Sequence, residues 1–218
     1  MRTVVIFSGG LDSTVLLAKL IAEGRECLAL TFKYGQKHAR EIAAAQAICG
    51  LFGVRHQVVD LGALASLWGG NSLTDPALPV PDGHYTEERM KVTVVPGRNL
   101  VFLSIGTAWA IAEGADTLAY GAHGGDHVIY PDCRSEFTAA LAPAIALSDW
   151  RAVRLEHPFV NMTKTDIVRL GTAIGAPMHL SWSCYKGGAL HCGRCATCVE
   201  RKEAFANSGN PDPTHYAE

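Results

Sequence analysis

Four cysteines close to the carboxy terminus have the spacing of metal ligands. They form the pattern C-x7-C-x2-C-x2-C and are Cys184, Cys192, Cys195 and Cys198. Four thiolates this close in sequence can reach one tetrahedral centre, which predicts one zinc ion per chain; an iron–sulfur cluster or a redox pair is the alternative. A shell of four thiolates leaves no open coordination position, so this zinc is expected to be structural rather than catalytic.

A loop rich in glycine and serine near the amino terminus has the composition of a phosphate-binding site. The segment predicted to hold a nucleotide comprises Phe7, Ser8, Gly9, Gly10, Leu11, Asp12, Ser13 and Thr14. Its glycines let main-chain N–H groups approach an anion, and the helix predicted to begin there adds unpaired N–H donors and a partial positive charge. The hydroxyl groups at positions 8, 13 and 14 can donate to phosphate oxygens. The alternative is a tight strand-to-helix turn with a polar cap.

Two further features of this loop bear on its chemistry. Asp12 would repel a phosphate, and it is therefore expected to cap the turn or to hold Mg²⁺. The chain contains no G-x-x-x-x-G-K-[ST] pattern, so the loop is not a Walker loop. Because the Walker lysine is missing, attack on the α-phosphate of ATP is favoured over transfer of the γ-phosphate.

The segments around the loop alternate between strands and helices. Short apolar runs predict strands at residues 3–7, 26–32, 55–60, 117–120 and 153–158. Helical periodicity predicts a helix after the loop and further helices at residues 37–52, 99–113, 136–148, 163–174 and 198–206. Thr163 is a suitable N-cap for one of them. The alternation predicts an α/β fold, with a Rossmann-like parallel sheet and helices on both faces.

The chain divides into a large domain and a small carboxy-terminal segment. Residues 1–180 are expected to form the nucleotide-binding domain, with a long irregular insertion at 60–97 that is rich in Pro, Gly, Asn and Asp. Residues 181–218 contain the cysteine pattern and a final helix. The polar tail from residue 208 is expected to be loosely held.

The composition limits the classes of partner. Hydrophobic residues make up 48% and charged residues 18% of the 218 residues, which is ordinary for a globular protein. The formal net charge is −2, which does not favour a broad nucleic-acid-binding surface, since such a surface needs clustered Lys and Arg. We see no targeting segment and no run long enough to span a bilayer, so we expect a cytoplasmic protein.

The string S-G-G-L-D-S resembles the S-G-G-x-D-S signature of the PP-loop ATP pyrophosphatases. Further blocks resemble one family of that group, the 7-cyano-7-deazaguanine synthases of the queuosine pathway, and they follow the order found in that family. These blocks lie at residues 34–38, 95–100, 130–137, 163–164 and 182–185, followed by the three later cysteines. The loop at 121–126 keeps the family pattern only loosely. The resemblance covers residues 7–198.

The resemblance implies an ATP-dependent carbon–nitrogen ligase of the PP-loop fold. Its substrates would be 7-carboxy-7-deazaguanine, ammonia and ATP with Mg²⁺, and its product the 7-cyano base, formed through an activated carboxylate and an amide. Both steps need a pocket that stabilises anions and excludes water, since water competes with ammonia. The resemblance also implies a homodimer. The net charge and the lack of a membrane-spanning run predict no direct contact to nucleic acid or membrane.

Four charged residues in the family blocks and the 121–126 loop are candidates for catalysis. Arg98 and Lys164 carry positive charge suited to the α-phosphate or to the substrate carboxylate; an exposed salt bridge is the alternative for each. Asp126 and Asp132 can hold Mg²⁺ or accept hydrogen bonds from the base; a helix or turn cap is the alternative. The aromatic side chains that can stack on a flat ring are Tyr130, Phe159 and Trp182.

Two other functions compete with this interpretation. A tRNA-thiolating PP-loop enzyme would need a basic face and a catalytic cysteine pair, but here the net charge is negative and the clustered cysteines are assigned to zinc. A zinc-knuckle nucleic-acid-binding module would need a basic, aromatic surface around residues 181–206, and it would leave the amino-terminal blocks unexplained.

Overall fold

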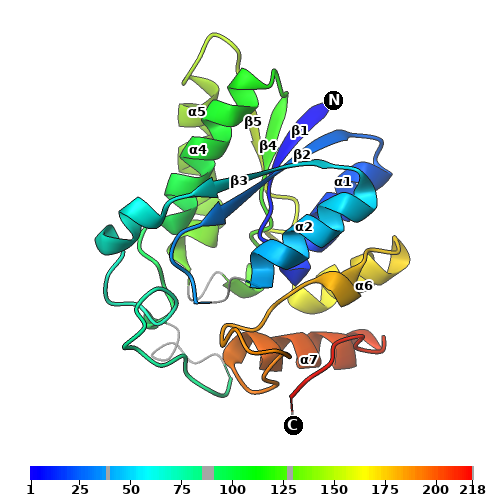
Figure 1. Ribbon diagram of the computed structural model, residues 1–218. Helices are drawn as coiled ribbons and strands as arrows, with labels where there is room; N and C mark the ends of the chain where they lie inside the picture. Colours follow the sequence, from blue (N-terminus) through cyan, green and yellow to red (C-terminus); the bar gives the residue numbers. More distant parts are fainter. Residues whose placement is uncertain (38–39, 85–90, 127–129, 218) are drawn as a thin grey trace.

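The computed structural model describes residues 1–37, 40–84, 91–126 and 130–217 of the chain (Figure 1). Its sheet has five parallel strands in the order β3-β2-β1-β4-β5. The strands are β1 (Arg2–Ile6), β2 (Glu26–Lys33), β3 (Arg55–Asp60), β4 (Thr117–Ala119) and β5 (Arg154–Glu156). The predicted parallel Rossmann-like sheet is therefore confirmed.

Helices cover both faces of this sheet, as Figure 1 shows. The helices of one face are α1 (Leu11–Ala22), α2 (Arg40–Phe52) and α6 (Lys164–Ala173). The other face carries α4 (Arg98–Ala112) and α5 (Ser135–Ala146). The last helix, α7 (Ala196–Ser208), packs beside α6. The layered arrangement matches the expected α/β architecture.

The strands are apolar on both sides because each side meets a helical layer. Val4 in β1 belongs to the core cluster under α4 and α5, whereas its neighbour Val5 belongs to the cluster under α1 and α6. The same alternation occurs in β4, where Leu118 and Ala119 lie in opposite clusters. Successive side chains of a strand point to opposite faces, so a strand buried on both faces needs an unbroken apolar run.

Helix α6 begins where the sequence predicts it. Thr163 is its N-cap, and the Thr163 side chain accepts a hydrogen bond from the main-chain N–H of Asp166. The Asp166 carboxylate in turn accepts a hydrogen bond from the main-chain N–H of Thr163, which completes a capping box. This cap fixes the start of the helix and hence the position of Lys164, its first residue.

The insertion between β3 and α4 folds back onto the rest of the molecule. It starts with the short helix η1 (Gly62–Leu67), after which Trp68, Leu73 and Val95 are buried in the core cluster on the α4 side. Further along, Asp82 forms an isolated bridge with Cys195 and an ion pair of 2.6 Å with Lys186. The insertion therefore packs against the cysteine segment.

The carboxy-terminal tail is held tightly, contrary to the expectation of a loose tail. Tyr216 forms a bridge with His191, and the Tyr216 hydroxyl donates to Asp212 at 2.5 Å. The buried guanidinium of Arg201 donates to Thr214 Oγ1 at 2.6 Å and lies 3.8 Å from Asp212. A buried arginine needs acceptors, and the tail supplies two of them, which explains why this polar segment is ordered.

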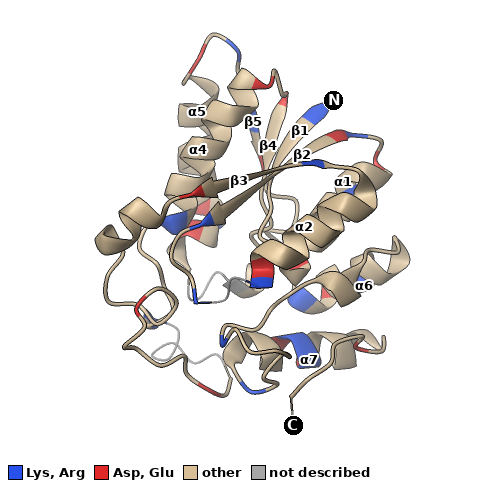
Figure 2. Cartoon of the chain, viewed as in Figure 1, with Lys and Arg blue, Asp and Glu red and all other residues tan. Residues whose placement is uncertain are grey.

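Basic and acidic residues are both distributed over the helices and loops in the view of Figure 2. Positions of Lys and Arg are interspersed there with those of Asp and Glu, in keeping with the small net charge. None of the helices among the described residues combines the length and apolar character needed to cross a membrane.

Gly9 allows the loop after β1 to lie against α2. Its φ is +81°, and a Cβ there would lie 2.5 Å from the Glu41 carbonyl oxygen and 2.7 Å from the Ala45 nitrogen. We expect Gly9→Ala to lower the free energy of unfolding by about 3 kcal/mol, measured by urea denaturation, because strain and overpacking add.

The matched control is Gly24→Ala. Gly24 also has a positive φ, of +74°, but a Cβ there meets nothing within 4 Å. Only the backbone strain of about 1 kcal/mol is expected for this variant. Equal losses in the two variants would show that contact with α2 does not require glycine at position 9.

Candidate active site

A cavity of about 210 Å³ opens at the carboxyl ends of the parallel strands. Its walls come from the ends of β1, β2 and β4, from the loop after β1, from the first turns of α4 and α6, and from the cysteine segment with α7. β1 leads to α1 on one face of the sheet, while β4 leads to α5 on the other. Neighbouring strands whose connections diverge in this way leave a crevice, which is where ligands bind in such sheets.

The glycine loop, residues 8–13, forms one wall of this cavity. Ser8 Oγ accepts a hydrogen bond from the Gly10 main-chain N–H at 3.1 Å and lies 3.1 Å from Ser13 Oγ. Helix α1 begins at Leu11, and no side chain of the described residues caps it. The first turn of α1 therefore presents main-chain N–H groups and the positive end of the helix dipole at the cavity wall, which suits an anion.

Two members of the predicted nucleotide-binding segment point into the protein instead. Thr14 is fully buried, and its hydroxyl donates to the Gly10 carbonyl oxygen at 2.8 Å, one helical turn back. The expectation that this hydroxyl serves a phosphate therefore does not match its position. The Phe7 ring is also fully buried, in the core cluster under α1 and α6, and its carbonyl oxygen accepts from Thr31 Oγ1. Both residues therefore support the loop from the protein interior.

Lys164 links three helices at the edge of the cavity. Its Nζ lies 2.7 Å from Asp12 Oδ2 on α1 and 3.3 Å from Glu200 Oε2 on α7. The fully buried ring of His123, which follows β4, places Nε2 3.1 Å from the same Nζ. The Nδ1 atom of His123 accepts a hydrogen bond from the Gly125 main-chain N–H at 3.1 Å. Two carboxylates thus neutralise the charge of Lys164.

Asp12 is ionised in this environment. Burial alone raises the pKa of the Asp12 carboxyl, but the positive charge of Lys164 and its hydrogen bond outweigh burial, so the pKa lies below its ordinary value. Its second oxygen, Oδ1, is buried, and no described residue donates a hydrogen bond to it. A carboxylate oxygen without a donor, on a residue of the cavity wall, fits a Mg²⁺ ion that enters with a nucleotide.

Arg98, the first residue of α4, lines the same cavity as the glycine loop and lies among aromatic rings. Its guanidinium donates to the Tyr34 hydroxyl at 3.4 Å and lies 6.0 Å from the centre of the Tyr34 ring. Phe102 and Tyr185 line the same cavity. The side chain is half-buried and contributes to the cavity wall, as a residue that binds a ligand anion would.

The two predicted acidic residues take different positions. Asp132, in η3 (Pro131–Cys133), accepts a hydrogen bond from the main-chain N–H of Asn99 at 3.1 Å and so caps the first turn of α4. This is the helix-cap alternative considered from the sequence. Asp126 is the last residue of η2 (Gly124–Asp126), and its side chain lies outside the described part of the structure.

The three aromatic residues predicted to stack on a ligand also take different positions. Tyr130 and Trp182 line the cavity, and the Tyr130 hydroxyl lies 3.0 Å from Thr93 Oγ1. Phe159 is fully buried in the core cluster under α1 and α6, so it is a core residue and does not stack on a ligand. Phe159 directly follows the strand predicted at residues 153–158, and nothing in the sequence there distinguishes a core residue from a ligand-binding residue.

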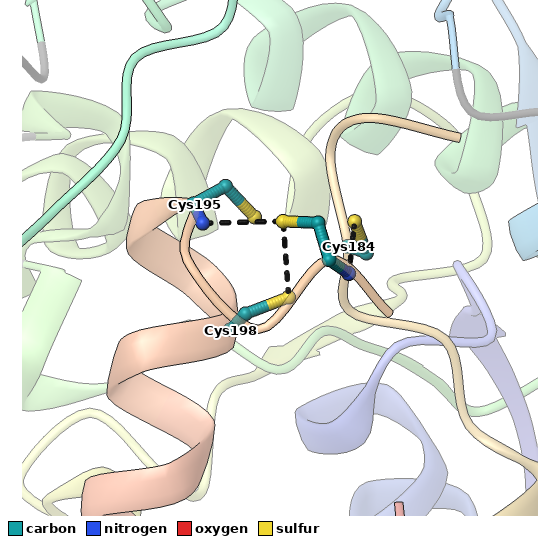
Figure 3. Close-up of side chains that lie close together, drawn as sticks. Cys184, Cys195 and Cys198 are labelled. Atoms are coloured by element: carbon teal, nitrogen blue, oxygen red, sulfur yellow. Dashed lines mark hydrogen bonds between the residues drawn. The ribbon is translucent and has the colours of Figure 1, made fainter. Parts of the chain in front are cut away.

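The four predicted cysteine ligands meet at one point. Their sulfur atoms all lie within 4.8 Å of one another, and Figure 3 shows those of Cys184, Cys195 and Cys198 turned towards each other. A tetrahedral centre with Zn–S bonds of about 2.3 Å separates its sulfurs by about 3.8 Å. The sulfurs of Cys192 and Cys198 are 3.9 Å apart. The cluster can therefore hold one metal ion.

Main-chain N–H groups around the cluster support thiolate ligands. Those of Lys186 and Cys192 donate to Cys184 Sγ at 3.4 Å, and that of Cys195 donates to Cys192 Sγ at 3.2 Å. His191, the neighbour of the second cysteine, is not a fifth candidate, because its Nε2 accepts from the Ser183 main-chain N–H at 3.0 Å. Burial lowers the pKa of His191 to about 4.

The cysteine segment also reaches the glycine loop directly. The main-chain N–H of Trp182 donates to the Gly9 carbonyl oxygen at 2.9 Å, and its indole N–H donates to the Cys184 carbonyl oxygen at 2.9 Å. Thr197 Oγ1 donates to the Ser183 carbonyl oxygen at 2.8 Å. Trp182 therefore connects the cysteine cluster to the glycine loop at the cavity wall.

Comparison with known proteins assigns the family. Residues 2–209 match the family described as queuosine biosynthesis protein QueC. The chain belongs to the QueC family. A relative from Caldicellulosiruptor bescii, named 7-cyano-7-deazaguanine synthase, is 50% identical over 99% of this chain and 97% of its own length. A relative of the same name from Methanoregula boonei is 48% identical over 99% of both chains.

Solved structures with similar folds are more distant from this QueC chain. A 4-thiouridine synthetase, solved with RNA and bound ATP, superposes with a TM-score of 0.55 at 16% identity, over 99% of this chain and 47% of the other. An NMN synthetase from Francisella tularensis gives a TM-score of 0.53 at 13% identity, over 96% and 78% of the two chains. At these identities the likeness establishes the shared fold.

Several residues of the QueC cavity were not predicted from the sequence patterns. Glu200 and His123, the partners of Lys164, were not singled out, and neither were Tyr34 and Tyr185 in the aromatic part. Tyr34 and Tyr185 lie inside blocks that carry the family resemblance, and this was an available signal. Glu200 follows the last cysteine by two residues, and only the packing of α7 beside α6 brings it to Lys164.

The lowered pKa of Asp12 predicts a pH-dependent contribution to stability. A carboxyl whose pKa is lower in the folded state stabilises the fold above its unfolded pKa of about 3.9, and this contribution is lost as the pH falls through the folded pKa. We expect Asp12→Asn to lower the free energy of unfolding by about 2 kcal/mol between pH 5 and 7, with the difference shrinking below about pH 4.

Urea denaturation of both proteins at several pH values measures this difference. Asp149→Asn is the control, since Asp149 is exposed and accepts a hydrogen bond from a nearby main-chain N–H. It should change stability little at any pH. A wild-type minus Asp12→Asn difference that is the same at pH 3 and pH 7 would show that Asp12 is not held ionised by Lys164.

Proposed function

We propose that this protein converts 7-carboxy-7-deazaguanine, ammonia and ATP into 7-cyano-7-deazaguanine. The observation that carries the proposal is the 50% identity, over nearly the whole chain, to a relative named 7-cyano-7-deazaguanine synthase. The cavity supports it, because the glycine loop, Arg98 and Lys164 all line one space at the strand ends. The protein would then be an ATP-dependent carbon–nitrogen ligase in queuosine biosynthesis.

The first activation makes the amide. A carboxylate oxygen of the substrate attacks the α-phosphorus of ATP and pyrophosphate leaves, which gives an acyl adenylate. Ammonia then attacks the acyl carbon, AMP leaves with the former carboxylate oxygen, and the nitrogen loses a proton. The N–H groups at the start of α1 can stabilise the negative charge that develops on the phosphate oxygens.

The second activation makes the nitrile. The amide oxygen attacks the α-phosphorus of a second ATP and pyrophosphate leaves. The nitrogen then loses its two remaining protons, AMP leaves with the oxygen, and a carbon–nitrogen triple bond results. Attack at the α-phosphorus agrees with a loop that lacks the Walker lysine.

Individual residues would contribute by position and charge. Mg²⁺ would reduce the negative charge of the nucleotide phosphates, with the free Oδ1 of Asp12 as a ligand. Asp126 remains a second candidate ligand, and Asp132 would act by fixing the start of α4. Lys164 would keep Asp12 ionised and in place.

The metal of the cysteine cluster is proposed to be zinc, in a structural role. Four thiolates match a closed tetrahedral shell, which supplies folding energy and no reaction chemistry. We treat residues 1–180 as the nucleotide-binding domain and 181–218 as a zinc-binding segment that completes its cavity. We also propose a homodimer, which the family resemblance implies, and a cytoplasmic protein that acts on small molecules without direct contact to nucleic acid or membrane.

Removal of one cysteine tests the zinc proposal. We expect about one zinc per chain by elemental analysis of the wild type, and much less in Cys198→Ser, with an unfolding temperature about 10 °C lower. Cys27→Ala is the control: Cys27 is buried away from the cluster, and burial raises the pKa of its thiol to about 11. Unchanged zinc in Cys198→Ser, or iron with sulfide in the wild type, would contradict the proposal.

Direct assay tests the reaction. The zinc-loaded protein is incubated with 7-carboxy-7-deazaguanine, ATP, Mg²⁺ and ammonium, and mass spectrometry follows the acid, the amide and the nitrile. We expect the nitrile, with the amide as a transient species, and no product when ATP is omitted. If neither amide nor nitrile forms while ATP still binds, the substrate assignment fails and the nucleotide site remains.

A further inference from the structure

The two cationic side chains of the cavity differ in how their charge is compensated. Lys164 has two carboxylates within 3.3 Å, those of Asp12 and Glu200. Arg98 has no carboxylate within 4.0 Å among the described residues, and its hydrogen bond to a side chain goes to the neutral Tyr34 hydroxyl. The cavity therefore contains one cation in contact with two carboxylates and one cation that makes no ion pair with a described carboxylate, since the charge of Asp132 acts on Arg98 from beyond contact distance.

The carboxylate of Asp132, which acts electrostatically on Arg98, already accepts a hydrogen bond from the main chain. Asp132 accepts the main-chain N–H of Asn99 and holds the start of α4. The remaining neighbours of Arg98 are the aromatic residues Tyr34, Tyr130 and Tyr185, which offer rings and hydroxyl groups. A half-buried guanidinium in such a setting has several N–H donors that no described side chain accepts, so a ligand in the cavity can accept them in place of water.

Two anions of the proposed reaction are candidates for this position: a phosphate of ATP and the carboxylate of the deazapurine acid. The glycine loop and the start of α1 already provide N–H donors for phosphate. Arg98 instead makes its contacts with an aromatic ring, and flat rings stack on aromatic side chains. The guanidinium fork also matches a carboxylate in a planar, two-point contact.

We propose that Arg98 binds the carboxylate of 7-carboxy-7-deazaguanine and thereby distinguishes the first substrate from the amide intermediate. The proposal rests on the function proposed above. A carboxylate offers two acceptor oxygens and a negative charge to the guanidinium. The amide is neutral, has one acceptor oxygen, and presents an NH2 group whose donors face those of the guanidinium. Arg98 is therefore a specificity-determining residue for the first activation and contributes much less to the second.

The test measures the two activations separately in one set of variants. Wild type, Arg98→Met and Arg98→Lys are assayed with the acid and, independently, with the synthetic amide, each with saturating ATP and ammonium. We expect Arg98→Met to lower kcat/KM for the acid about 100-fold and for the amide less than about 10-fold. Arg98→Lys should recover part of the loss with the acid, since it keeps the charge and loses the two-point contact.

Controls separate this role from loss of folding or of nucleotide binding. Arg55→Met replaces an exposed arginine at the start of β3, away from the cavity, and should leave both activities unchanged. Calorimetric ATP affinity and the unfolding temperature of Arg98→Met should match those of the wild type. Equal losses with acid and amide, or a loss of ATP affinity, would overturn the proposal and make Arg98 a phosphate ligand. A wild type that forms no amide or nitrile would instead refute the proposed function.

Discussion

The contact of Lys164 with Asp12 and Glu200 holds the cavity together. Each carboxylate comes from a different helix, α1 and α7, and the ammonium comes from the capped first residue of α6. In a partly buried cluster, loss of one member leaves the others without a countercharge, so the three helix positions depend on one another. The glycine loop, at the start of α1, therefore has its orientation set partly by the cysteine segment, at the start of α7.

Because of this dependence, the carboxy-terminal segment is a structural part of the cavity. Trp182 donates to the carbonyl oxygen of Gly9, and Thr197 and Glu200 line the cavity. A metal held by the four cysteines would fix both ends of this contact, because the cluster spans the turn after Trp182 and the start of α7. The cavity is thus built from both parts of the chain. Lys164 is ion-paired on one side, and Arg98 makes no ion pair with a described carboxylate on the other.

Much of the fold could be predicted because its signals are local. Apolar runs and the alternation of elements predicted the parallel sheet, Thr163 predicted the start of α6, and the short spacings predicted that the four cysteines meet at one point. What failed depended on packing between distant segments. The Thr14 hydroxyl turned out to bond one helical turn back, Phe159 entered the core, and Glu200 reached Lys164 only through the packing of α7 on α6. No local pattern encodes such pairings.

The ordered tail has a consequence for the cavity. Arg201 on α7 is buried against Met178, Ser181 and the tail, and the bridge to His191 is made by Tyr216. Thr214 and Asp212 supply acceptors to the buried Arg201 guanidinium, so the packing of α7 depends on the docked tail. Glu200 precedes Arg201 on the same helix, so the tail supports the cavity wall that contains Glu200, although no described residue of the tail lines the cavity.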